Sequence, residues 1–286
     1  SPALPGRPRC PAPAASHEPA RPQPPMDLID SHCHLDATEF DPDRDQVLAR
    51  ARKAGVTRQL VPATTAAGWP KLRQVCAATP GLYPAYGLHP VFLAEHRPQH
   101  LDALGEWIER ERPKAIGECG LDHFVDGLDP QAQAFYFEGQ LRLAGDTGLP
   151  LVVHARRAVD ATIAAIRRIG TGSGLRGVVH SFSGSPEQAR RLWDLGFLIG
   201  LGGPLTWERA LRLRRLVAAM PLQFLLLETD APDQPDAGIP GQRNEPARLT
   251  RVLETVAQLR GQDPAEIAAA TTANAERLFG LSAAAD

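Results

Sequence analysis

The stretch LPLVVHARRAVDATIAAIRRIGTGSGLRGVVHSF, residues 149–182, decides how this chain folds. Its apolar runs at 151–154 and 177–180 are rich in β-branched valine and predict strands with both faces buried. Between them, residues 159–169 repeat apolar side chains at the period of a helix. A strand, a helix and another strand in this order predict two parallel strands joined by a crossover helix.

The same alternation continues in both directions from this stretch. Strands are expected at 27–30, 58–62, 82–87, 114–118, 151–154, 177–180, 197–201 and 224–229. Helices are expected at 41–54, 68–78, 101–112, 130–146, 159–169, 186–195, 207–218, 246–259 and 264–278. An open, doubly wound sheet would alternate in a similar way. The count of eight strands, with the polar residues at their ends, favours an α/β fold of the closed (β/α)8 TIM barrel type.

Length and composition agree with a single barrel domain. A barrel of this kind takes roughly 250 residues, and the chain has 286. Residues 1–25 are rich in Pro, Ala and Arg and are expected to form a disordered tail, which leaves 26–286 for the barrel. Hydrophobic residues make up 43% and charged residues 22% of the chain, which is typical of globular proteins rather than of fibrous or low-complexity ones.

Charge, cysteine content and hydropathy limit the cellular compartment and the kinds of partner that we expect for this protein. The net charge of -2 provides no overall basic field, so polyanion binding must rely on a local patch or on metals. The four cysteines form no C-x-x-C pair, which suits a reducing cytosol. No apolar run is long enough to span a membrane, and residues 1–25 lack the apolar segment of a secretory signal. We expect a cytoplasmic protein without membrane contact, and no motif calls for an obligate protein partner.

Polar side chains stand at the predicted carboxyl ends of several strands, where barrels place their active sites. These residues are His32, His34, Glu118, His154, His180, Glu228 and Asp230. Because side chains alternate along a strand, His32 and His34 share one face, and Cys33 points to the other. Glu228 and Asp230 share a face for the same reason. The pattern predicts that histidines and carboxylates converge at one mouth of the barrel.

Such a group has the ligand chemistry of a metal site. One ion seldom needs so many ligands, whereas two divalent ions about 3.5–4 Å apart would use them with a carboxylate between. Glu118 is the natural bridge because the fourth strand lies about halfway round the barrel from the first. Taken singly, each residue could have a purely structural role. Glu228, in particular, could orient a ligand instead of being one. The convergence of the whole set carries the prediction.

Four motifs resemble those of the TatD family of metal-dependent hydrolases. They are Asp30-Ser31-His32-Cys33-His34-Leu35-Asp36, Gly117-Glu118-Cys119-Gly120-Leu121-Asp122, Val178-Val179-His180-Ser181-Phe182-Ser183-Gly184 and Leu227-Glu228-Thr229-Asp230-Ala231-Pro232. Their order and spacing match the family from Asp27 to about Leu281. The resemblance implies a (β/α)8 barrel and metal-dependent hydrolysis. The family includes deoxyribonucleases, some of which are 3′ to 5′ exonucleases.

The resemblance also implies a ligand set. It assigns His32, His34 and Asp230 to one metal ion, His154 and His180 to the second, and Glu118 to both. The segment Asp233-Gln234-Pro235 and the later Gly241-Gln242 resemble the YjjV branch of the family. Asp233 and His123 stand where many relatives carry an aromatic residue. These departures leave the ligand positions unchanged and bear on the substrate.

The expected reaction is hydrolysis of a phosphodiester by a water activated between two divalent ions, Zn2+, Mg2+ or Mn2+. Asp230 or Glu228 would accept the proton of that water. His89 and Arg156 are the candidate substrate contacts, although a turn histidine and a surface arginine would look the same in the sequence. Histidine ligands favour Zn2+, and the family resemblance favours Mg2+ or Mn2+.

Three functions remain open at this point. The first is a nuclease acting on DNA ends, and the second is a hydrolase of a small phosphoester, carboxyester or amide on the same metal site. The third is a metal-binding scaffold without catalysis, against which the intact ligand set argues.

Overall fold

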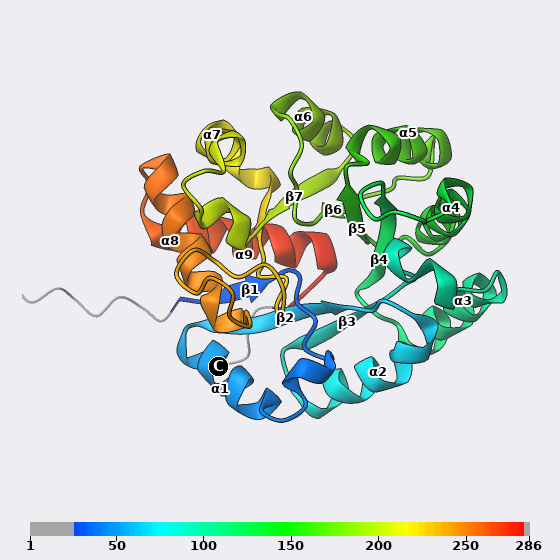
Figure 1. The fold of residues 1–286 in the computed structure, drawn as a ribbon, viewed down its shortest axis with the longest axis horizontal. Helices are drawn as coiled ribbons and strands as arrows, with labels where there is room; N and C mark the ends of the chain where they lie inside the picture. The colour runs from blue at the N-terminus through cyan, green and yellow to red at the C-terminus, as the bar shows by residue number, and fades with distance from the viewer. Residues whose placement is uncertain (1–25, 283–286) are drawn as a thin grey trace, which may run out of the picture.

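Eight parallel strands form one sheet in the order β1 to β8 in the computed structural model, which describes residues 26–282. Figure 1 shows the strands at the centre of the molecule with helices around them. The strands are β1 (Leu28–Asp30), β2 (Val56–Pro62), β3 (Leu82–Tyr86), β4 (Ala115–Asp122), β5 (Leu151–Arg156), β6 (Gly177–Val179), β7 (Phe197–Leu201) and β8 (Leu225–Leu227). The tail expected at 1–25 lies outside the described residues.

A helix follows each strand, and a ninth α-helix ends the described chain. The α-helices are α1 (Arg44–Lys53), α2 (Trp69–Ala78), α3 (Gln99–Glu111), α4 (Pro130–Thr147), α5 (Val159–Gly170), α6 (Pro186–Asp194), α7 (Leu211–Ala219), α8 (Leu249–Arg260) and α9 (Pro264–Phe279). Short 3-10 helices are η1 (Thr38–Phe40), η2 (Ala66–Gly68), η3 (Pro90–Glu95), η4 (Gly203–Thr206), η5 (Leu222–Phe224) and η6 (Pro246–Arg248). They lengthen the connections around the barrel.

Backbone hydrogen bonds join the last strand region to the first. Ser31 N donates to Leu227 O at 3.0 Å, and Asp230 N donates to His32 O at 2.8 Å. Every other neighbouring pair of strands is parallel and in sequence order. The predicted (β/α)8 barrel is therefore confirmed, and the open, doubly wound alternative is excluded.

Two apolar layers hold the barrel together. Inside it, strand residues such as Ile29, Leu60, Val152 and Leu226 pack with Leu278 of α9 in one buried cluster. Ile29, Val152 and Leu226 precede the polar residues at the ends of their strands, so α9 covers the amino end of the barrel and leaves the carboxyl end for the site. A second, larger cluster fills the space between the strands and the surrounding helices. Burial on both faces explains why the strands read as continuous apolar runs.

The strand bounds differ from the expectation where they matter for the site. β4 continues four residues past Glu118 to Asp122, so Glu118 lies inside the strand rather than at its end. Gln133 of α4 allows the longer strand because its amide bonds both the backbone N–H and the carbonyl of Asp122. β8 ends at Leu227, so Glu228 and Asp230 stand in the loop that follows it.

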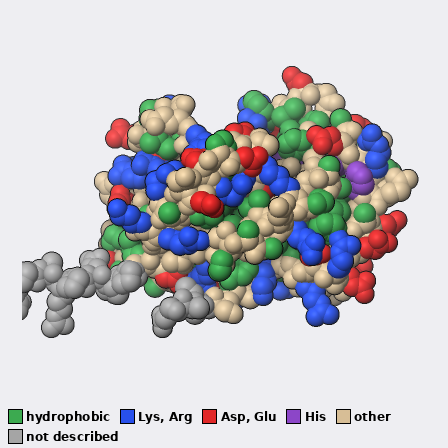
Figure 2. Space-filling model, turned by 90° about the horizontal axis from the view of Figure 1, so that it is seen from below, with side chains coloured by type: hydrophobic (Ala, Val, Ile, Leu, Met, Phe, Trp, Pro, Cys, Tyr) green, Lys and Arg blue, Asp and Glu red, His purple; other side chains and the backbone are tan. Residues whose placement is uncertain are grey.

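The surface carries no dominant charge. Figure 2 shows Lys and Arg side chains interspersed with acidic and hydrophobic ones over one side of the molecule. Within residues 26–282, no helix combines the length and the hydropathy needed to cross a membrane.

Candidate metal centre

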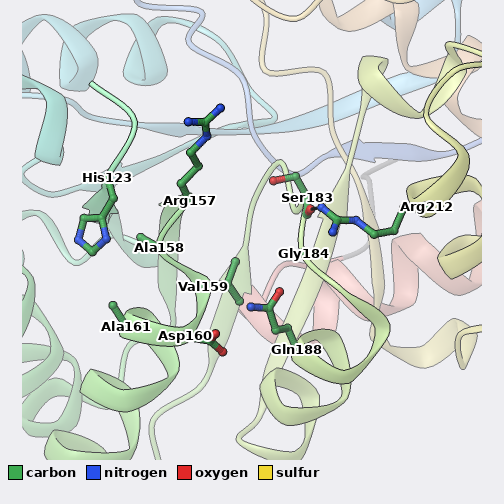
Figure 3. A pocket seen from close by; sticks show the side chains of 10 residues that line it. All are labelled: His123, Arg157, Ala158, Val159, Asp160, Ala161, Ser183, Gly184, Gln188 and Arg212. Atoms are coloured by element: carbon green, nitrogen blue, oxygen red, sulfur yellow. Dashed lines mark hydrogen bonds between the residues drawn. The ribbon is translucent and has the colours of Figure 1, made fainter. Parts of the chain in front are cut away.

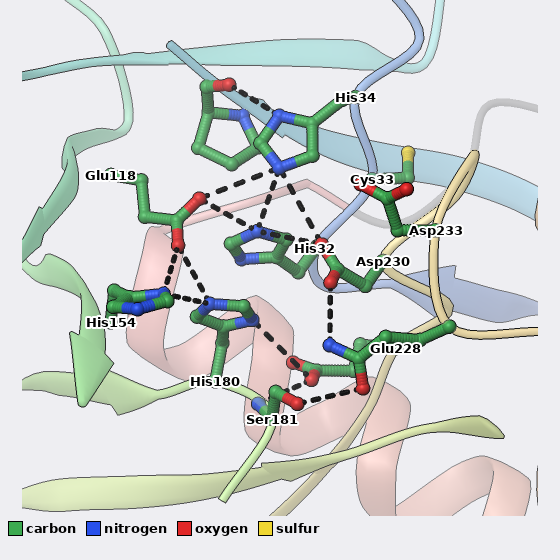
Figure 4. Close-up of polar contacts among 12 residues, drawn as sticks. His32, Cys33, His34, Glu118, His154, His180, Ser181, Glu228, Asp230 and Asp233 are labelled. Carbon is green, nitrogen blue, oxygen red and sulfur yellow. Dashed lines mark hydrogen bonds and ion pairs between the residues drawn. The ribbon is translucent and has the colours of Figure 1, made fainter. Parts of the chain in front are cut away.

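The polar residues predicted from the strand ends meet in a cavity of about 1080 Å³ at the carboxyl end of the barrel. His34, Glu118, His154, His180 and Asp230 all line it. Figure 4 shows their side chains, from five different strand regions, turned toward one another. Residues up to two hundred positions apart in the sequence thus share one pocket.

Glu118 lies at the centre of this group and is 1% exposed. Its Oε2 atom is 3.1 Å from His32 Nε2 and 3.4 Å from His34 Nε2. Asp230 Oδ1 completes this side, at 3.4 Å from His32 Nε2 and 3.5 Å from His34 Nε2. Two imidazoles and two carboxylates therefore surround one position.

The other oxygen of Glu118 faces a second group. Glu118 Oε1 is 2.7 Å from His180 Nε2, 3.2 Å from His154 Nδ1 and 3.1 Å from His89 Nε2. His180 Nε2 and His154 Nδ1 are 3.4 Å apart. Each oxygen of one carboxylate thus faces its own cluster of histidine nitrogens, which is the arrangement expected of a bridging ligand.

These atoms have the donor chemistry and spacing of a metal site. Buried Glu118 Oε2 has no hydrogen-bond partner among the described residues. The facing His32 and His34 nitrogens are only 3.2 Å apart. Ligand atoms of three triplets lie within 4.8 Å of one another, namely His32-His34-Glu118, His89-Glu118-His154 and His32-His180-Glu228. Imidazole and carboxylate donors of this kind suit Zn2+ and neighbouring divalent ions.

Further groups fix which nitrogen of two of the histidines faces the centre. His34 Nδ1 is 3.1 Å from Pro62 O, a carbonyl that can only accept a hydrogen bond. His154 Nε2 is 2.8 Å from Asp122 Oδ2. A proton held on these outer nitrogens leaves the inner lone pairs of His34 and His154 free for a cation.

Electrostatics keep the two carboxylates of the centre ionised. Burial opposes ionisation of Glu118, but the charge of His180 and of its neighbouring histidines holds the pKa of Glu118 well below its ordinary value. Burial also opposes ionisation of Asp230, yet the hydrogen bond to His34 and the nearby imidazoles lower its pKa to about 2. Both carboxylates are therefore available as anionic ligands at neutral pH.

The histidines divide into two groups by pKa. Burial would lower the pKa of His34 and His180, but their carboxylate neighbours raise both values well above the ordinary one. The pKa of His154 is also raised, because Asp122 and Glu118 outweigh its burial. Burial dominates at His32 and His89 and lowers their pKa values. A cation entering this centre must therefore displace protons from imidazoles.

Asp30 ties the first and last ligand segments together. Its carboxylate accepts hydrogen bonds from His32 N at 3.2 Å, Thr229 N at 3.0 Å and Thr229 Oγ1 at 2.5 Å. Burial nonetheless raises the pKa of Asp30 to about 7. Because Thr229 precedes Asp230, this contact aligns ligands that enter the centre from β1 and from the loop after β8.

The loop after β8 is held by amide side chains. Gln234 Nε2 donates to Asp230 Oδ2 at 2.6 Å. Asn244 Nδ2 donates to the carbonyls of Thr229 and Asp233, both at 2.9 Å. Asp230 itself has a φ of 57°, a left-handed conformation that Asp tolerates better than most residues. These contacts give Asn244 a structural role in holding the loop that carries Asp230.

The other predicted site residues, Glu228, His89 and Arg156, lie in three different environments around the centre. Glu228 is 1% exposed and does not line the cavity; its Oε1 is 3.6 Å from His180 Nδ1, whereas the other ring nitrogen, Nε2, faces Glu118. His89 Nδ1 accepts from Val91 N, so His89 is both a turn residue and a neighbour of Glu118. Arg156 is exposed, lines the cavity and places its guanidinium 3.7 Å over the Phe124 ring.

Sequence reasoning did not single out Asp122 or Gln234 as site residues. Asp122 carried a usable signal, because it lies two positions from Gly120 and four from Glu118 on the same strand. Gln234 carried none, since only the path of the loop brings its amide to Asp230. Cys33 and Cys119 are fully buried and bond backbone carbonyls, as expected of packing residues.

Comparisons with known proteins agree with this geometry. The family model described as TatD-related DNase matches residues 29–280. The chain is 40% identical over 256 residues to a protein described as "Uncharacterized metal-dependent hydrolase YjjV" of Escherichia coli K12, covering 89% of this chain and 98% of that protein. It is 35% identical over 260 residues to "3'-5' ssDNA/RNA exonuclease TatD" of Citrobacter rodentium, covering 89% and 98%.

A solved structure shows the same likeness in three dimensions. The crystal structure of the TatD homolog YjjV from Escherichia coli K12 superposes with a TM-score of 0.85 and 40% sequence identity, covering 89% of this chain and 98% of that one. With the sequence match spanning the whole barrel and all four motifs, the chain belongs to the TatD-related DNase family of metal-dependent hydrolases.

Proposed function

We propose that this hydrolase cleaves phosphodiester bonds as a deoxyribonuclease of the 3′ to 5′ exonuclease type, with two divalent ions bound at the centre. One observation carries the proposal: the two oxygens of buried Glu118 face separate groups of histidines. His32, His34 and Asp230 would hold one ion, His154 and His180 the other, and Glu118 both. The ions would provide Lewis-acid stabilisation of phosphoryl charge and a more acidic water.

Among the two candidate proton acceptors, the geometry favours Asp230. Its side chain is 13% exposed and lines the cavity, and its low pKa keeps it ionised. Glu228 is instead engaged by Ser181 N at 2.5 Å and lies beside His180 Nδ1. We assign Asp230 the role of accepting a proton from the attacking water, and Glu228 that of orienting His180.

We assign substrate contact to two residues that line the cavity. Arg156 lines the cavity without an ion pair among the described residues, and a guanidinium can bind a phosphate through two parallel hydrogen bonds. His89 has its Nε2 at 3.1 Å from Glu118 Oε1, so it borders the second ion position rather than the outer rim. His89 can therefore contact either a phosphoryl oxygen or a cation.

Support for a nucleic-acid substrate comes from the exonuclease relative at 35% identity. Which ion works in the cell is a separate matter. The count of histidine nitrogens favours Zn2+ in a mixture of metals, while Mg2+ or Mn2+ follows from the family resemblance. Residence in the cytoplasm likewise remains a prediction from the cysteine pattern.

A second candidate has one observation in its favour. Asp233 lines the cavity near Asp230, and burial together with the Asp230 charge raises its pKa. A carboxyl group here is unfavourable for a polyanion and more acceptable for a small phosphoester, carboxyester or amide. This alternative uses the same metal centre and differs only in the substrate.

The deciding experiment combines elemental analysis with degradation of a labelled single-stranded oligonucleotide in Mg2+, Mn2+ or Zn2+. Glu118→Gln should lose bound metal and lower cleavage by about 10²-fold or more. Its matched control, Glu254→Gln on the exposed face of α8, should leave both unchanged.

Absence of oligonucleotide cleavage by metal-loaded wild type would reject the nuclease. Hydrolysis of model esters in that case would establish the second candidate. Assays in which His180→Ala leaves every activity unaltered would instead point to a scaffold.

A further inference from the structure

A second cavity of about 470 Å³ lies beside the metal centre. Figure 3 shows Arg157, Arg212, Ser183 and His123 around it, on the loops after β5, β6 and β4 and on α7. Ser183 lines this cavity and the one that holds the metal centre. The two spaces are therefore neighbours along the carboxyl end of the barrel, and one extended ligand can reach both. A volume of this size falls within the range of small-ligand sites, roughly 300–1,000 Å³.

The charge of this second cavity is positive. Neither Arg157 nor Arg212 forms an ion pair with any described residue, although ion pairs are frequent elsewhere on the surface. Arg212 Nη2 donates to Ser183 O at 2.5 Å, which holds its guanidinium at the rim. The one carboxylate that lines the space, Asp160, is 3.0 Å from Arg191 Nη1 and is thus neutralised.

Backbone N–H groups at the start of α5 add to the positive potential of the two arginines, although the arginines alone define the site. Val159, Asp160 and Ala161 open α5 and line the cavity, and Ala158 before them provides no side-chain cap. The start of α6 differs, because Ser185 and Gln188 form a capping box there. Peptide N–H groups at an uncapped helix start favour an anion.

An aromatic side chain contacts one arginine from each cavity. Phe124 is 43% exposed, with the Arg156 guanidinium at 3.7 Å and the Arg157 guanidinium at 4.6 Å from its ring centroid. Arg156 lines the metal cavity, and Arg157 lines the second one. Exposed aromatic rings beside cationic groups are the usual platform for a single-stranded nucleic acid, whose bases stack and whose phosphates bind the cations.

We propose that the second cavity binds a non-scissile phosphate of a single-stranded nucleic acid whose scissile phosphate lies at the metal centre. Arg157 and Arg212 contact that phosphate, and Arg156 with Phe124 guides the strand between the two cavities. This inference rests on the proposed phosphodiesterase function and adds a binding site for a second phosphate of the same strand. A small phosphoester fills only the metal cavity and gains nothing from Arg157 or Arg212.

The test compares two substrates in the metal-loaded, full-length protein. Arg157→Gln, Arg212→Gln and the double variant keep most of the side-chain stem while removing the charge. Arg251→Gln on α8 is the control, because it removes an equal charge from an exposed position paired with Glu254. A labelled single-stranded oligonucleotide and bis(p-nitrophenyl) phosphate are hydrolysed in parallel, each over a range of salt concentrations. Thermal melting checks that every variant is folded.

For the double variant, kcat/KM on the oligonucleotide should fall by about 10- to 100-fold, mainly through KM. The slope of log(kcat/KM) against log[salt] should become less negative by about 0.7, as expected for one lost phosphate contact on a single strand. Hydrolysis of bis(p-nitrophenyl) phosphate should stay within about twofold of wild type, as should both activities of Arg251→Gln.

Oligonucleotide cleavage by the folded double variant at the wild-type rate and salt slope would overturn the subsite alone. Equal losses on both substrates would also overturn it, because they would place the arginines in support of the metal centre. A wild-type protein that hydrolyses only the small diester would instead refute the nuclease proposal, and with it the second-cavity assignment.

Discussion

Replacement of Asp122 by Asn tests whether a residue behind the ligands sets the metal affinity. Asp122 is 1% exposed, and its Oδ2 is 2.8 Å from His154 Nε2. Its Oδ1 accepts from the backbone N–H groups of Phe124 and Val125, both at 2.9 Å. Asn can keep these two backbone bonds while turning its amide N–H₂ toward His154. The Nε2 atom would then accept a hydrogen bond instead of donating one, so the ring proton would sit on Nδ1 and face the metal position.

The expected loss of metal affinity follows from this exchange of the His154 tautomer. Substitution of outer groups that orient histidine ligands usually weakens metal binding by about 10- to 100-fold, which corresponds to about 1.4–2.7 kcal/mol. Folding should change little, because the two backbone bonds are retained. The pKa of His154 should fall as well, since burial lowers it and the bond to Asp122 is the largest contribution raising it.

The assay is competition with a chromophoric chelator for Zn2+, at mildly alkaline pH where protons compete least. An NMR titration of His154 in the metal-free protein gives the second readout. Asp129→Asn is the control, because Asp129 caps α4 from an exposed position and Asn caps a helix equally well. An affinity within twofold of wild type, together with an unshifted His154 titration in folded Asp122→Asn, would refute the assigned role.

Three other outcomes are expected. Asp236→Asn should lower the free energy of unfolding by about 1–2 kcal/mol at neutral pH. Burial opposes ionisation of Asp236, but Arg248 holds its pKa below the ordinary 3.8, so the stabilisation is present above that pH and is lost as the pH falls through the folded pKa. A difference in stability from wild type that persists in denaturant titrations at acid pH would contradict this. Leu226→Ala, inside the barrel, should cost about 2–5 kcal/mol, with urea melts as the measure and exposed Leu211→Ala as the control. Chelation should lower the melting temperature and restoring Zn2+ should raise it. The effect should shrink as the pH falls, because protons compete for His34 and His180, whose pKa values are raised well above the ordinary 6.5. A melting temperature insensitive to metal would count against the centre.

The ligand chemistry could be predicted because it depends on local rules. Side chains alternate along an extended chain, so His32 and His34, which lie just past β1, were expected to share a face, and both turn Nε2 toward Glu118. Parallel strands send their carboxyl ends to one side of a barrel, so His154 and His180 had to meet there. Neither inference needs a distance, and the structure agrees with both.

Other parts of the centre depend on contacts between distant segments. Glu118 was expected at the end of its strand, but Gln133 of α4 supports four more residues and brings Asp122 to His154. No periodicity in the sequence encodes that contact, because it joins a strand to a helix that follows a loop. The assignment of Asp230 rather than Glu228 as proton acceptor likewise needed the path of the loop after β8.

The sequence by itself determined the eight alternations of strand and helix, the barrel and the kinds of atoms offered to a cation, because each follows from residues a few positions apart. Only the tertiary structure decided how those atoms are shared between the two oxygens of Glu118, and that Arg157 and Arg212 form a second cavity beside them. The physical reason is that distances between separate loops are set by packing of the whole barrel, whereas strand and helix periods are set by the local backbone.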